Sequence, residues 1–72
     1  MKEINKLVYS LKNEPEKWQC KRFAVKNEYA EIWDSSGVLF LTLNEMHPGI
    51  IAKYKLYRAA KICRLKNAVR GL

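Results

Sequence analysis

The residues in this chain whose types and spacing suggest chemistry are cations, and they gather in its last third. Residues 50–72, IIAKYKLYRAAKICRLKNAVRGL, contain seven lysines and arginines and no aspartate or glutamate. The seven lysines and arginines before them are matched by the seven acidic residues of the chain, so the net charge of +7 belongs to this one segment. Such a concentration of positive charge attracts phosphates and carboxylates, and the attraction weakens as salt is added.

Residues that could support catalysis are few and isolated. His47 is the only histidine, and it has no cysteine or second histidine at the spacing of metal ligands. Ser10, Ser35 and Ser36 do not occur in a nucleophile motif, and the three glycines do not form a phosphate-binding loop. We therefore expect no enzymatic activity, no metal site, no cofactor and no small-molecule substrate.

Binding is the remaining class of function, and two hypotheses fit the charge distribution. The first is a regulatory or accessory module that binds DNA or RNA, with a tyrosine that packs against sugar or base between the cations. The alternative is a small inhibitor or adaptor protein, of the kind made by phages and mobile elements, that binds an acidic surface of a host protein. The candidate nucleic-acid contacts are Lys53, Lys55, Tyr57, Lys61, Arg64, Lys66 and Arg70.

Length and composition predict one domain that spans residues 1–72. Hydrophobic residues make up 49% of the chain, which suffices for a core. Lys2, Glu3 and Lys6 interrupt the apolar residues of the N-terminus, which argues against a signal peptide, and the longest apolar run, 38–41, is too short to cross a membrane. We expect a cytoplasmic protein without a membrane partner.

Cys20 and Cys63 are interpreted as buried free thiols, with a single disulfide bond as the alternative.

Hydrophobic spacing predicts a helix followed by three strands. Residues 2–13 place Ile4, Leu7, Val8 and Leu11 on one face of a helix. Strands rich in β-branched and aromatic residues are expected at 18–25, 29–33 and 38–43. The first alternates poorly, which indicates either a bulge or a register different from the one assigned. Turns are expected at 26–28 and 34–37. The third strand is apolar on both sides, so we expect it to be the best-buried strand or to meet another molecule with its second face.

A second helix is predicted from residue 50 to about residue 69, after a connector at 44–49 in which Pro48 suits the first helical turn. It has two apolar stripes. The larger stripe is expected to contact the sheet and consists of Ile51, Tyr54, Ile62, Leu65 and Val69. The smaller stripe is expected to be covered by the first helix or to form a partner or homodimer interface, with Leu56, Ala59, Ala60 and Cys63 as its candidate contacts.

These elements predict an α+β fold of order α-β-β-β-α, in which a three-stranded antiparallel meander is packed by a short N-terminal helix and a long basic C-terminal helix. Antiparallel pairing follows from the short loops, because a parallel crossover needs about a dozen residues or more. The order is similar to that of double-stranded-RNA-binding domains. Their lysine-rich start of the last helix and the glycine-rich loop before it are not matched, since residues 47–50 contain no lysine and the first lysine after them is Lys53. We therefore assign the chain to no family.

Overall fold

The computed structural model describes residues 2–26, 29–43 and 51–71, and it confirms the predicted α+β fold. Helix α1 (Lys2–Asn13) leads through the short 3-10 helix η1 (Pro15–Lys17) into the strands. These are β1 (Trp18–Ala24), β2 (Tyr29–Asp34) and β3 (Leu39–Thr42), and helix α2 (Ile51–Arg70) follows them. The helix and strand bounds lie within one residue of the predicted ones. Two residues of the turn expected at 26–28, and the connector at 44–49, lie outside the described residues.

The strands form the predicted antiparallel meander in the order β1-β2-β3. The turn between β2 and β3 is built by Asp34, whose Oδ1 accepts hydrogen bonds from Ser36 N (2.9 Å), Ser36 Oγ (2.7 Å) and Val38 N (3.0 Å). Gly37 adopts a φ of 92°, a conformation that other residues rarely take. The residue types at this turn therefore determine its geometry.

The first strand departs from regular pairing where its poor alternation indicated. The register between β1 and β2 shifts between Lys21 and Ala24, and Arg22 takes a φ of 56°. The prediction that the third strand is the best buried was wrong. That position belongs to β2, the central strand, in which Ala30 and Ile32 are fully buried, whereas Phe40 on the edge strand β3 remains 58% exposed.

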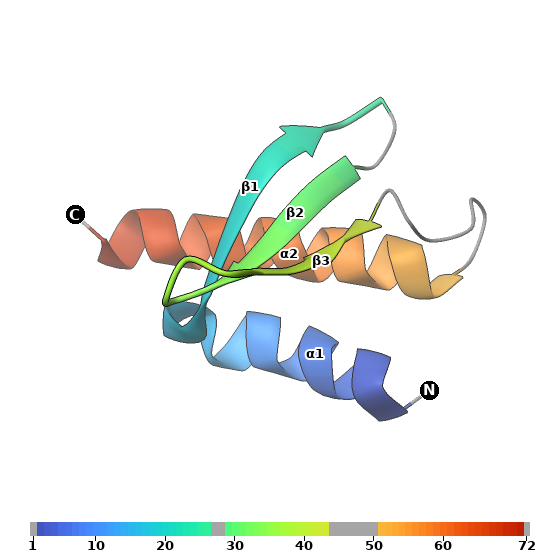
Figure 1. The fold of residues 1–72 in the computed structure, drawn as a ribbon, viewed down its shortest axis with the longest axis horizontal. Coiled ribbons are helices and arrows are strands. Elements are labelled where there is room, and N and C mark those ends of the chain that lie inside the picture. The colour runs from blue at the N-terminus through green and yellow to red at the C-terminus, as the bar shows by residue number, and fades with distance from the viewer. Residues whose placement is uncertain (1, 27–28, 44–50, 72) are drawn as a thin grey trace.

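The core lies where α1, α2 and one face of the sheet meet. Figure 1 shows α2 behind the sheet and α1 beside it, with both helices running in the same general direction. Leu7 and Leu11 of α1 pack with Ile32 of β2, with Leu43 and with the buried face of α2. The predicted core face of the first helix is therefore confirmed.

The second helix buries the opposite stripe from the one we expected. Leu56, Ala59, Ala60 and Cys63 are fully buried, so the smaller stripe is the core contact. Ile51 and Val69 of the larger stripe are 72% and 78% exposed, which makes the expected contact of that stripe with the sheet wrong. The reason is geometric: α1 and the sheet both approach α2 from the same side, and small side chains let three elements pack closely.

Polar contacts hold the C-terminal half of α2 against the start of β1. Asn67 Nδ2 donates hydrogen bonds to the carbonyl oxygens of Pro15 and Trp18, both at 2.9 Å, and Lys66 Nζ donates one to the carbonyl oxygen of Lys12 at 2.6 Å. Trp18 Nε1 in turn donates to Ser10 Oγ at 2.8 Å. These contacts set the side of α2 that faces solvent.

Of the helices described, none has the length and apolar content required to cross a membrane.

Candidate binding surface

Cations line the solvent side of α2, and none of them has a carboxylate partner among the described residues. Ion pairs among the described residues join Lys17 to Glu14 at 3.3 Å and Arg22 to Glu31 at 3.2 Å, and neither includes a residue of α2. The cations of α2 are therefore not neutralised by the described part of the chain. Among the candidate contacts, Lys53 is partly buried, and the exposed ones are Lys55, Lys61, Arg64, Lys66 and Arg70.

The predicted role of Tyr57 as an aromatic contact was wrong. This residue is only 6% exposed, and its ring packs against that of Phe23 with the centroids 5.9 Å apart. Lys61 Nζ lies 5.5 Å from the centroid of the tyrosine ring. The Tyr57 hydroxyl has no hydrogen-bond partner among the described residues. Tyr57 therefore belongs to the core, and the remaining tyrosine on this helix, Tyr54, is 53% exposed.

The predicted partner or homodimer interface was also wrong in its residues. Leu56, Ala59, Ala60 and Cys63 have no exposed surface, because α1 and the sheet cover them. A second molecule has no access to these side chains in the folded chain. The expectation that the first helix covers this stripe holds instead.

An apolar stripe remains exposed on the opposite side of α2. We call it the outer stripe and define it as Ile51 (72% exposed), Tyr54 (53%), Leu65 (67%) and Val69 (78%). In a helix with 3.6 residues per turn, Lys61 and Arg64 lie along one side of this stripe and Lys55 and Lys66 along the other, while Arg58 interrupts it. The sequence marked these residues as apolar but not as exposed. The signal that could have identified the buried face was the small size of its alanines.

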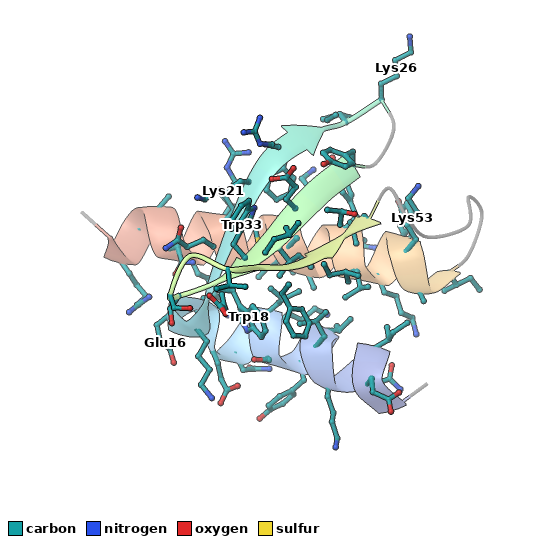
Figure 2. All side chains as sticks on the ribbon, in the orientation of Figure 1. Glu16, Trp18, Lys21, Lys26, Trp33 and Lys53 are labelled. Carbon is teal, nitrogen blue, oxygen red and sulfur yellow. The ribbon has the colours of Figure 1, made fainter. Side chains whose placement is uncertain are left out.

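Aromatic and charged side chains also meet on the sheet face that is turned away from α2. The carboxylate of Glu31 accepts hydrogen bonds from Tyr29 Oη at 2.8 Å and from Trp33 Nε1 at 2.9 Å, in addition to its ion pair with Arg22. Lys21 Nζ lies 4.9 Å from the centroid of the Trp33 ring, and Figure 2 shows the two residues together on the sheet. The hydrogen bonds from Trp33 and Tyr29 lower the pKa of Glu31.

Glu14 and Asp34 are stabilised in their charged forms in the same way. The Ser10 hydroxyl and Lys17 lower the pKa of Glu14, and the Val38 backbone N–H and Ser36 lower the pKa of Asp34. Each of these groups binds its proton more weakly in the folded chain than in the unfolded chain. The stability that they contribute is present above the unfolded pKa of about 4 and is lost as the pH falls through the lower folded pKa.

We therefore expect the melting temperature to fall as the pH is lowered from about 5 to about 2. Thermal unfolding followed by circular dichroism measures this change. The Glu31→Gln variant should show a shallower acid dependence than the parent, because glutamine has nearly the same size but no carboxylate that can gain a proton. Glu3→Gln on α1 controls for the loss of one negative charge. An acid dependence that is unchanged in Glu31→Gln would contradict the role given to this carboxylate.

The two cysteines are free thiols that contact each other between β1 and α2. The interaction between the two thiols raises the pKa of Cys20 and lowers that of Cys63, and the Cys63 thiol donates a hydrogen bond to the carbonyl oxygen of Pro15 at 3.8 Å. Cys63 Sγ also accepts a hydrogen bond from Asn67 Nδ2 at 3.6 Å. The sequence predicted buried free thiols with a disulfide as the alternative; both thiols are free, and Cys63 is buried whereas Cys20 is half-buried.

The side chains singled out as chemically reactive in the sequence have structural contacts or lie outside the described ranges. Ser10 Oγ donates to Glu14 Oε1 at 2.9 Å and accepts from Trp18 Nε1, so it joins α1 to β1. No three His, Cys, Asp or Glu side chains of residues 2–26, 29–43 and 51–71 gather as metal ligands would. His47 lies outside these ranges.

Comparison with protein-family models, with curated proteins and with solved structures gives no significant match.

Proposed function

We propose that this domain is a non-enzymatic binding module, of the inhibitor or adaptor type, whose α2 docks on an acidic, amphipathic surface of a partner protein. The observation that supports the proposal is the outer stripe, which lies exposed between cations that have no carboxylate partners in the described chain. Protein interfaces combine an apolar centre with a polar rim in this way. A partner with apolar side chains flanked by aspartate and glutamate would complement the stripe and the cations together.

The large apolar side chains of the outer stripe favour a protein partner over nucleic acid. Interfaces with DNA are polar and strongly positive, so Ile51, Leu65 and Val69 would gain little from a phosphate backbone. Fully burying an aliphatic side chain of this size contributes about 1.5–3 kcal/mol. A protein groove would therefore use both the apolar and the charged residues, whereas a duplex would use only the charged ones.

Nucleic acid is the second candidate, and the cations of α2, which form no ion pair with a carboxylate of the described residues, favour it. Lys55, Lys61, Arg64, Lys66 and Arg70 are exposed along one helix, and each phosphate they neutralise would release counterions. Affinity for a duplex would then fall steeply as salt rises. A second copy of the chain is a weaker candidate, because two cationic α2 faces would repel each other.

The test compares two probes on the same set of variants. The first probe is a fluorescent helical peptide with leucine along one face and glutamate beside it, and the second is duplex DNA or RNA in about 50 mM salt. We expect the peptide to bind, and Leu65→Ser with Val69→Ser to weaken binding at least about tenfold, which corresponds to 1.4 kcal/mol. Lys61→Glu with Arg64→Glu should weaken it similarly. Fluorescence anisotropy measures both affinities.

The controls separate the two candidates. A scrambled peptide of the same composition has the same charge without the apolar face, and it should bind more weakly than the helical peptide. Equal binding of the two peptides, or an unchanged affinity in the Leu65→Ser and Val69→Ser variant, would reject docking through the outer stripe. A duplex that binds at low micromolar concentration and responds only to the charge-reversed variant would favour nucleic acid instead.

A further inference from the structure

A cavity of about 360 Å³ opens between the end of β1 and the side of α2. Phe23 and Tyr57 contribute two aromatic rings to it, tilted by 57° to each other. Leu65 of the outer stripe also lines the cavity, so the two features form one continuous surface. The walls are mostly apolar, and the volume lies near the lower end of the range of ligand-binding pockets. This size suits one bulky side chain better than a large ligand.

Two cations of α2 stand over the aromatic rings of this cavity. Arg64 Cζ lies 5.0 Å from the centroid of the Phe23 ring, and Lys61 Nζ lies 5.5 Å from that of the Tyr57 ring. Such cation–π contacts hold the charged groups beside the rings while leaving them exposed to solvent. Neither cation forms an ion pair with a described carboxylate. The cavity thus combines an apolar interior with two positive charges that are free to pair with an incoming anion.

We propose that this cavity is the anchor site for one bulky apolar side chain, such as phenylalanine, in an acidic peptide segment of the partner. The apolar side chain packs on Phe23, Val25 and Leu65, and carboxylates next to it in the peptide pair with Lys61 and Arg64. The assignment rests on the proposed function of α2 and adds to it a single position at which the partner is selected. Interfaces commonly concentrate their affinity on such a buried aromatic anchor with charged neighbours.

Charge complementarity favours an acidic peptide segment over other apolar molecules that could fill the cavity. A second copy of the chain would bring further cations toward Lys61 and Arg64. An apolar segment without acidic residues would fill the cavity but leave both charges unpaired. A free fatty carboxylate shares the chemistry of an acidic peptide, and decanoate is therefore included in the test as a separate probe.

The experiment is a titration of the ¹⁵N-labelled full chain with three short peptides, followed by the shifts of its amide signals. The first peptide has one phenylalanine among aspartates and glutamates, the second has serine in place of phenylalanine, and the third has lysine in place of every acid. We expect the first peptide to shift the signals of Phe23, Lys61 and Arg64. The serine peptide should bind at least about tenfold more weakly, and the lysine peptide should not bind.

Ala68 provides a matched pair of variants, because it lines the cavity and is exposed on α2. Ala68→Trp fills the cavity and keeps both cations, so it should weaken binding of the phenylalanine peptide at least about tenfold. Ala68→Ser keeps the cavity open and should bind as the parent does. Circular dichroism melting confirms that each variant is folded.

The outcomes distinguish the cavity from the proposed function. If Lys61→Glu with Arg64→Glu weakens peptide binding but Ala68→Trp does not, the anchor site is wrong and docking on α2 stands. If no acidic peptide binds, both are overturned. Decanoate that shifts the same signals while the phenylalanine peptide does not would make the cavity a site for a small carboxylate, which also overturns the assignment.

Discussion

Replacing Leu56 with alanine is expected to lower the free energy of unfolding by about 2–5 kcal/mol, while the same replacement at Leu65 should change it by less than about 0.5 kcal/mol. Both leucines lie inside α2, and leucine and alanine have similar helix propensities. Leu56 is fully buried and Leu65 is 67% exposed. The difference between the two variants therefore measures burial alone.

The Leu56→Ala change would remove a large share of the stability of this domain. A domain of 72 residues is stabilised by about 0.05–0.15 kcal/mol per residue, which amounts to about 4–11 kcal/mol in total. Urea unfolding measures the free energy of unfolding of each variant, and the two values can be compared directly if both depend on urea concentration with the same slope. Equal effects at the two positions, or a larger effect at Leu65, would mean that the helix buries the other stripe, and the outer stripe would lose its role as a docking surface.

Oxidation of the chain is expected to join Cys20 and Cys63 in an intramolecular disulfide and to raise stability by up to about 4 kcal/mol. The two thiols already lie next to each other between β1 and α2, so the bond forms between neighbours. It closes a loop of roughly 44 residues, and the stabilisation comes mainly from the entropy that this loop loses in the unfolded chain. In a reducing compartment the thiols stay free and the gain is absent.

The measurement uses oxidised glutathione, thiol counting and urea unfolding. We expect both thiols to disappear without formation of a dimer and the unfolding midpoint to rise. Adding reductant should restore the original midpoint. The Cys20→Ser variant, which retains a small side chain at a half-buried position, should show no response to the oxidant. A stable mixed disulfide with glutathione, or an oxidised chain no more stable than the reduced one, would contradict the prediction.

Much of the fold was predictable from local patterns. Ile4, Leu7, Val8 and Leu11 repeat at helical spacing, and all four pack in or against the core. Asp34 and Gly37 define a tight turn by their own chemistry, since one supplies a carboxylate for backbone N–H groups and the other permits a positive φ. The antiparallel meander followed because the loops are too short for any other connection.

The candidate site was only half predictable. The positive charge of the site could be predicted from the sequence, because lysine and arginine side chains carry their charge whichever way the helix packs. Its apolar part could not, since the cavity joins Phe23 of β1 to Tyr57 and Leu65 of α2, residues more than thirty positions apart in the sequence. The same limit applied to the contact between Cys20 and Cys63.

Residue order alone therefore decided where the helices and strands occur, how the strands pair and where the positive charge gathers, because each of these depends on contacts between near neighbours. The tertiary packing decided which side of α2 is buried. Both sides of that helix are apolar, and helical spacing treats them alike. The small side chains of Ala59, Ala60 and Cys63 allow α1 and the sheet to approach α2 together, and this close packing leaves the larger side chains of the outer stripe facing solvent.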